Sequence, residues 1–129
     1  MKPNQVSTLV VEAALKVHTA LGAGVFESAY HACVAYELTR AGLCFEHEVH
    51  LPIVYNGVEL STAFRVDYIV EKCLIVELKC VERVLPVHRA QVLTYLRLSG
   101  LPLGLLLNFN VAHMRHGIYR LINAPQASL

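Results

Sequence analysis

Apolar side chains recur along this chain with two different periods, and the change between them marks where helices give way to strands. In the first segment they return every three or four residues, which predicts a helix over residues 7–21 with one apolar face. A second stripe of this kind predicts a helix over residues 26–41. Gly22 and Gly24 separate the two helices, and Gly42 ends the second one.

Over residues 45–51 the period shortens to two, because inward positions alternate with glutamate and histidine. This pattern predicts a strand with one solvated face. Asn56 and Gly57 follow, and both residues tolerate the positive φ of a type I′ turn, so they predict a hairpin. Two further strands are predicted over residues 63–70 and 73–79, joined by a tight connection.

The last third of the chain repeats the helix-to-strand change. A helix over residues 86–99 is predicted to begin with Pro86 in its first turn and to end before Gly100. The wholly apolar run over residues 101–109 predicts an inner strand that is covered on both faces, and a final strand is predicted near 117–122. The predicted order is ααββββαββ, an α/β fold in which helices flank one mixed sheet.

Size and charge limit the function classes. The chain has 129 residues, of which 55% are apolar and 16% are charged, so its composition argues against disorder. We expect one domain over residues 1–129, because a chain of this length buries roughly two thirds of its unfolded surface. The net charge of +1 gives no global electrostatic case for binding nucleic acid or a membrane, so any basic patch must be local.

Cysteine usage and apolar run lengths indicate a cytoplasmic protein. No run approaches the roughly 18 consecutive apolar residues that span a bilayer, and the N-terminus lacks the layout of a signal peptide. The four cysteines have neither CxxC spacing nor the density of a secreted disulfide framework, so we expect them to be free, small core residues. Segments 44–50 and 113–116 contain histidines, but neither supplies four zinc ligands at a recognised spacing.

Acids and a lysine interrupt the strand segment "VDYIVEKCLIVELK", residues 66–79. Glu77 and Lys79 are two residues apart and so project from the same face of one strand. A two-residue turn between the strands would place Asp67 opposite Val76, whereas a three-residue connection through Cys73 places it opposite Glu77. We predict the three-residue connection or an equivalent bulge.

Two carboxylates held this close favour a bound cation, because they repel each other and lose hydration. Asp67, Glu77 and the carbonyl of Leu78 would offer oxygen ligands, which suit Mg²⁺ or Mn²⁺. Such an ion activates a bound water, and Lys79 would orient that water or stabilise charge on a phosphate. By the spacing alone, the more common explanation is a cross-strand ionic network on a solvated face, because paired surface charges are common on edge strands.

Three motifs resemble those of a known nuclease superfamily. The segment "VDYIVEKCLIVELK" resembles the D...ExK core of the PD-(D/E)xK nucleases, with Val66 in place of the usual proline. "GAGVFESAY" is similar to the GxxExxY signature of a small bacterial family in that superfamily, through Gly24, Glu27 and Tyr30.

The third motif lies in the predicted helix over residues 86–99. "PVHRAQVLTYLRLSG" is similar to the QxxxY element of the RecB-like branch, with Gln91 and Tyr95 at its two ends. The resemblance extends from about residue 7 to residue 122, with the motifs in family order. It implies a restriction-endonuclease-like αβββαβ core, here with an added hairpin and extra terminal elements.

The resemblance also assigns roles to residues. It implies that Glu27, Asp67, Glu77 and the carbonyl of Leu78 hold a divalent metal, and that Lys79 is the catalytic amine.

Gln91 and Tyr95 share one helix face, and the resemblance implies that they contact the substrate phosphate or hold Lys79 in place. Arg89 is a further candidate for a phosphate contact. Each residue has a plainer interpretation: Glu27 as a charge at a helix N-terminus, Tyr95 as a core anchor, and Arg89 on a solvated face.

Three functions follow from these residues. The first is a metal-dependent nuclease that hydrolyses DNA phosphodiester bonds with Mg²⁺ or Mn²⁺. The second is a catalytically inactive subunit with a nuclease fold that binds nucleic acid or protein, and the third is a structural or oligomerising protein. The acid set is intact, which favours the enzyme. A homodimer is expected as well, because a monomer with so small a net charge would bind DNA weakly.

Overall fold

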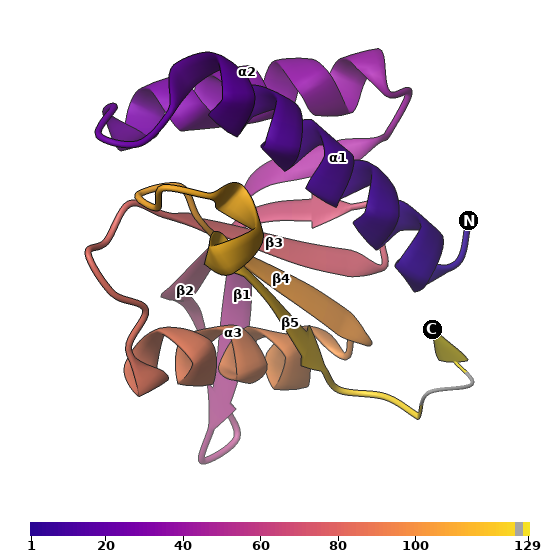
Figure 1. The fold of residues 1–129 in the computed structure, drawn as a ribbon. Helices are drawn as coiled ribbons and strands as arrows, with labels where there is room; N and C mark the ends of the chain where they lie inside the picture. Colours follow the sequence, from indigo (N-terminus) through magenta and orange to yellow (C-terminus); the bar gives the residue numbers. More distant parts are fainter. Residues whose placement is uncertain (126–127) are drawn as a thin grey trace.

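A five-stranded sheet divides the molecule into two layers of helices (Figure 1). The computed structural model describes residues 1–125 and 128–129, with the side chains of residues 61–63 excepted. The sheet contains β1 (Phe45–Tyr55), β2 (Val58–Val70), β3 (Leu74–Lys79), β4 (Leu103–Asn108) and β5 (Ile118–Ile122). The helices are α1 (Pro3–Leu21), α2 (Glu27–Arg40), α3 (Pro86–Ser99) and the short 3₁₀ helix η1 (Met114–Gly117).

The strands follow one another across the sheet in chain order, β1-β2-β3-β4-β5. β3 and β4 are parallel, and the other neighbouring pairs are antiparallel. Parallel strands need a crossover, which α3 supplies on the face opposite α1 and α2 (Figure 1). The mixed α/β fold with flanking helices is therefore confirmed, and α2-β1-β2-β3-α3-β4 forms its restriction-endonuclease-like αβββαβ core.

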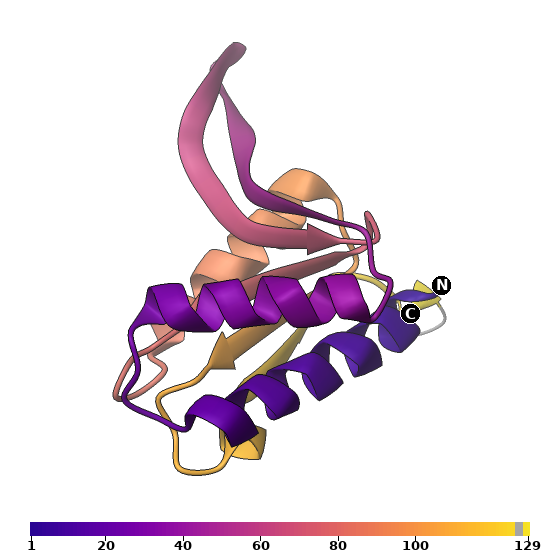
Figure 2. The same cartoon turned by 90° about the horizontal axis from the view of Figure 1, so that it is seen from above.

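The predicted four strands before α3 are wrong, because the structure has three. Asn56 (φ 51°) and Gly57 (φ 76°) form the predicted tight turn, with Tyr55 paired to Val58. The strands on both sides of this turn run on without interruption into β1 and β2. Pro52 does not end β1; the strand ladder absorbs it as a shift in register there. The result is one long hairpin whose tip extends beyond the helices (Figure 2).

Smaller predictions were off for local reasons. α1 begins at Pro3, four residues earlier than predicted, because proline fits the first turn of a helix. Gln5 stabilises this start by accepting a hydrogen bond from the Lys2 backbone N–H at 2.8 Å. The cysteines are free as predicted, yet none of them is fully buried and Cys44 is exposed.

Two apolar cores cover the two faces of the sheet. On one face α1 and α2 pack Val10 and Val34 over strand residues such as Leu105. On the other face α3 packs Val92 and Leu96 over strand residues of the second core. β4 is buried along its whole length, as its unbroken apolar run predicts.

Gly104 sets how closely α3 approaches the sheet. A Cβ at this position would lie 2.9 Å from Val92 Cγ1 and 3.4 Å from Leu96 Cδ1. The missing side chain therefore brings the helix that carries "PVHRAQVLTYLRLS" down onto β4.

We expect Gly104→Val to lower the free energy of unfolding by about 1–3 kcal/mol, because the added methyl groups overfill this contact. Urea denaturation of both proteins measures the change. An unchanged midpoint would show that α3 does not approach β4 this closely.

Candidate active site

The connection between β2 and β3 sets the register of the predicted acidic site. Val70 pairs with Leu74, which leaves three residues between the strands. Glu71 (φ 51°) and Lys72 (φ 55°) form the turn, and the Cys73 N–H donates to the Val70 carbonyl at 3.1 Å. The predicted three-residue connection is confirmed, and it places residue 67 opposite residue 77.

The side chains of Asp67 and Glu77 continue the hydrogen bonding between β2 and β3 at the point where the backbone ladder ends. The last backbone pair is Tyr68 with Val76. Next to it, the Asp67 N–H donates to Glu77 Oε1 at 2.7 Å, and the Leu78 N–H donates to Asp67 Oδ2 at 2.8 Å. Each carboxylate thus accepts a hydrogen bond from the opposite strand, and the two acids are held against each other.

The alternation of side chains along β2 reverses at Asp67, so this side chain lies between the two apolar cores that cover the faces of the sheet. Val66 packs in the core beneath α3, whereas Tyr68 packs in the core beneath α1 and α2. Residues two apart in a regular strand share one face, so the alternation reverses between them. On the neighbouring strand Glu48 has a φ of 55°, which is rare for a residue with a side chain. Asp67 therefore reaches both β3 and α2.

Glu77 is a charged residue in a poorly solvated place. It is only 5% exposed. Burial, followed by repulsion from Asp67, raises the pKa of Glu77 to about 8, although an N–H donor and Lys79 favour its ionised form. The positive charge of Lys79 is therefore too small to offset burial and the repulsion between the two acids, and an added cation would favour the ionised form of Glu77.

Glu27 reaches the site from the start of α2. Gly22 (φ 69°) and Gly24 (φ 80°) turn the chain sharply between α1 and α2. The buried Tyr30 ties this turn to α2, because its hydroxyl donates to the Gly22 carbonyl and accepts from the Val25 N–H. Tyr30 is thus structural, and the glycines direct the first turn of α2 toward the acids.

His31 lies between two of the predicted acids, and sequence reasoning missed it. Its Nε2 is 3.9 Å from Glu27 Oε2 and 3.8 Å from Asp67 Oδ2. Its Nδ1 is hydrogen-bonded to the Tyr68 hydroxyl at 2.8 Å, and His47 stacks on Tyr68 with ring centroids 4.6 Å apart. The signal was present in the sequence, since residues four apart share a helix face.

α3 brings the two residues of the QxxxY element to the same place. Lys79 Nζ donates to Gln91 Oε1 at 3.5 Å. Tyr95 is buried, and burial together with Glu77 and Asp67 raises the pKa of its hydroxyl to about 12. These two residues therefore adjoin Lys79 and the acids.

Arg89 lies elsewhere on α3. Its guanidinium stacks over the ring of Tyr119 on β5, 4.6 Å from the ring centroid. The structure does not bring Arg89 to the acids, and its contact with substrate stays a prediction.

The oxygen atoms of the acids are the ligand type that a hard cation prefers, but the acid side chains do not converge on one point. The Leu78 N–H points toward β2, where it donates to Asp67. The N–H and the carbonyl of one strand residue point toward the same neighbouring strand, so the Leu78 carbonyl also faces β2. Within the described residues, no three or more His, Cys, Asp or Glu side chains are close enough together to hold a metal ion. The Glu27 side chain is 52% exposed, so a change of rotamer is open to it.

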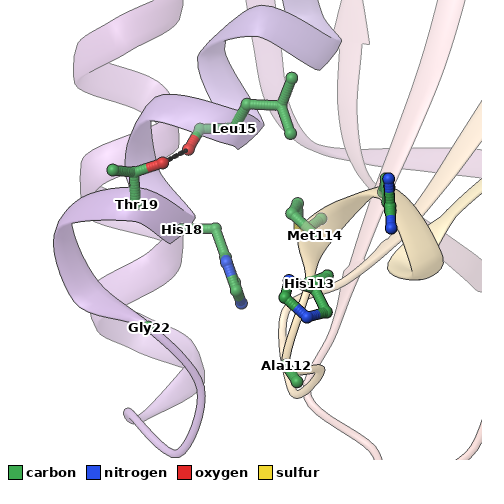
Figure 3. Close-up of a pocket in the computed structure, with 8 residues that line it drawn as sticks. Leu15, His18, Thr19, Gly22, Ala112, His113 and Met114 are labelled. Atoms are coloured by element: carbon green, nitrogen blue, oxygen red, sulfur yellow. Dashed lines mark hydrogen bonds between the residues drawn. The ribbon is translucent and has the colours of Figure 1, made fainter.

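The concave surface around Glu27, His31, Glu48 and Asp67 has a volume of about 470 Å³. A second cavity, of about 560 Å³, lies between the end of α1 and the segment leading into η1 (Figure 3). His18 and His113 line that second cavity, and His18 Nε2 is hydrogen-bonded to the Val111 carbonyl at 2.8 Å. The first cavity contains Glu27 and Asp67. Asp67 is hydrogen-bonded to the segment that carries the buried Glu77, so this cavity and the residues behind it form the candidate active site.

Comparison with known proteins identifies the family of this chain. A family model described as the PD-(D/E)XK nuclease superfamily matches residues 4–121. Among solved structures, the chain is similar to the crystal structure of SSO0001, with 19% identity and a TM-score of 0.48, over 95% of this chain and 67% of that one. No curated protein matches. Within the described residues no helix is both long enough and apolar enough to cross a membrane.

We expect the metal-free protein to lose stability as the pH rises. The pKa of Glu77 is raised from 4.5 to about 8 on folding, so the stabilisation is full below 4.5 and is lost as the pH rises through about 8. The loss amounts to a few kcal/mol, at about 1.4 kcal/mol per pKa unit. Urea denaturation with a chelator, at about pH 5, 7 and 9, measures it.

Glu77→Gln should flatten this dependence, whereas Glu46→Gln, at an exposed position on β1, should leave it as it is. Equal slopes in all three proteins would contradict the raised pKa of Glu77.

Proposed function

Since this chain belongs to the PD-(D/E)XK nuclease superfamily, we propose that it is a metal-dependent nuclease that hydrolyses phosphodiester bonds of DNA. The observation that carries the proposal is the reciprocal pair of hydrogen bonds between Asp67 and the Glu77–Leu78 segment. They hold two carboxylates together with Lys79 two residues further along β3.

Asp67, Glu77 and the Leu78 carbonyl would hold Mg²⁺ or Mn²⁺, with Glu27 completing the oxygen ligands. The raised pKa of the buried Glu77 supports this assignment, because a cation relieves the repulsion that raises it. When bound, such an ion lowers the pKa of a water and stabilises negative charge on a phosphate oxygen.

Lys79 is the proposed catalytic amine. It projects from the same strand face as Glu77, where its ammonium can bind a phosphate oxygen and orient the attacking water. Gln91 accepts a hydrogen bond from Lys79, which restricts the lysine side chain to this part of the site. The buried Tyr95 packs edge-on against Phe64, with 5.8 Å between the ring centroids, and this contact holds α3 against β2, the strand that carries Asp67.

A finer family assignment is part of the proposal. Gly24, Glu27 and Tyr30 match the GxxExxY signature of a bacterial family. Gly24 supplies the positive φ of the turn before α2, and the Tyr30 hydroxyl is hydrogen-bonded to that turn, which explains why the signature contains these two residues. Gln91 and Tyr95 match the QxxxY element of the RecB-like branch, and their position beside Lys79 supports that match. The four free cysteines fit the cytoplasmic location proposed with it.

A catalytically inactive binding subunit is the alternative. The observation that favours it is the placement of Glu27, which lies 3.9 Å from His31. In the described residues the three acids do not form a ready metal-binding group. Such a subunit would keep the fold and the concave surface around Glu27 and Asp67 without turnover.

We expect the purified protein to cleave DNA with Mg²⁺ or Mn²⁺ and to lose at least about a hundredfold in kcat when Glu77 or Lys79 is replaced by alanine. Gel assays on linear, circular, branched and single-stranded DNA measure the cleavage, and circular dichroism checks the fold. Lys16→Ala, at an exposed position on α1, is the matched lysine control and should keep full activity. Absence of cleavage by the wild-type protein with either metal would favour the binding subunit.

A homodimer is also proposed, with the hairpin tip as its contact. Val54, Tyr55 and Val58 are exposed there, at 71%, 65% and 57%. Residues 51–64 contain no lysine or arginine, so the tip is unsuited to DNA phosphates. An apolar tip that projects from the body suits a second copy of the same surface (Figure 2).

Light scattering coupled to gel filtration should give twice the mass of one chain. The double variant Tyr55→Ser, Val58→Ser should elute as a monomer, while Tyr36→Ser, at an equally exposed tyrosine on α2, should stay dimeric. A wild-type monomer at all concentrations would rule the dimer out.

A further inference from the structure

A groove lies beside Lys79 on the α3 side of the sheet, away from Glu27 and His31. It has a volume of about 470 Å³. One wall is a stripe of α3 that includes Val87, Ala90 and Gln91, which are spaced at helical intervals. The other wall comes from the strands, with Phe64 on β2 and Lys79 on β3. The groove therefore begins at the proposed catalytic amine.

Three side chains that line this groove, His88, Gln91 and Lys79, carry donors, and the Thr94 hydroxyl that also lines it already donates to the Ala90 carbonyl at 3.0 Å. His88 Nδ1 accepts a hydrogen bond from the Leu85 N–H at 3.0 Å, so in the neutral ring the proton is on Nε2. Gln91 uses its carbonyl oxygen to accept from Lys79, which leaves its amide NH₂ to donate. Lys79 is itself a donor. A ligand that matches this set carries acceptors, as phosphates and nucleobase edges do.

The apolar surfaces of the groove add a second requirement. Phe64 is held by its edge-on contact with the buried Tyr95 and is only partly buried itself. Val87 is 64% exposed on the opposite wall. Ala90 has a side chain too small to fill the space between them. A phosphate alone leaves these surfaces in water, whereas a flat base covers them.

We propose that this groove takes the base of an unpaired nucleotide next to the phosphate at Lys79. Phe64 stacks on the base, and His88 and Gln91 donate to its edge. A base inside a duplex is stacked and paired, and it reaches a side groove only if the duplex opens. The substrate class is therefore single-stranded DNA or the frayed end of a duplex. This inference rests on the proposed nuclease function and adds strand preference to it.

The test compares kcat/KM on a single-stranded oligonucleotide with kcat/KM on the same strand in a fully paired circle. The wild-type protein should prefer the single strand at least about tenfold, which is the scale of one stacked base. Ala90→Leu, which fills the groove from an exposed helix position, should lower that preference about tenfold. Ala20→Leu adds the same side chain at an exposed position of α1 and is the matched control.

Phe64 gives an independent measurement that does not need cleavage. With Ca²⁺ in place of Mg²⁺, fluorescence anisotropy measures the Kd for a labelled single strand. Phe64→Leu should weaken binding about tenfold and Phe64→Tyr should restore it, while an oligonucleotide that lacks the bases should bind all three proteins equally.

Two results would overturn the inference and leave the nuclease function standing. One is wild-type cleavage of the paired circle as fast as the single strand. The other is an Ala90→Leu protein that loses activity equally on both. If the wild-type protein cleaves no DNA at all, the nuclease proposal fails instead. The anisotropy measurements on the Phe64 variants then decide whether the groove binds a base.

Discussion

The whole site depends on the three-residue connection between β2 and β3. Side chains alternate along a strand with a period of two, so one residue more or less in the turn moves every partner of β2 to the other face of β3. With Cys73 included, Asp67 stands opposite Glu77 and each carboxylate takes an N–H from the opposite strand. Without it, Asp67 would face Val76, and the two acids would no longer meet.

The cost of this arrangement is visible in Glu77. A carboxyl group buried beside a second acid is destabilising in its charged form, and nothing in the fold of β3 requires one there. The surrounding apolar layers hold it in place: β4 is buried along its length, and α3 rests directly on Gly104. The fold thus keeps an acid pair that stability alone would disfavour, which is typical of functional sites.

Sequence-based reasoning failed where tertiary context extends or redirects a local pattern. The hairpin around Asn56 and Gly57 was recognised from turn chemistry, yet its strands were divided, because the alternating pattern was followed only to residue 51, whereas the ladder continues past Pro52 with a shift in register. His31 was overlooked, because its helix spacing from Glu27 has meaning only once Asp67 lies on the other side of it. Arg89 stacks over Tyr119 on β5, and its contact with substrate stays a prediction.

The sequence by itself determined the helices, the inner strand, the tight turn and the residues with candidate chemistry, because these depend on local period and on the backbone preferences of single residues. It also predicted the register of β2 and β3, since the acids match only one connection length. Only the tertiary structure decided that β2 turns over at Asp67, that His31 lies between two carboxylates, and that Lys79 opens onto a groove lined by Phe64 and α3. Those features arise where separate elements meet, and the relative placement of two elements depends on how their apolar faces pack, which no local pattern records.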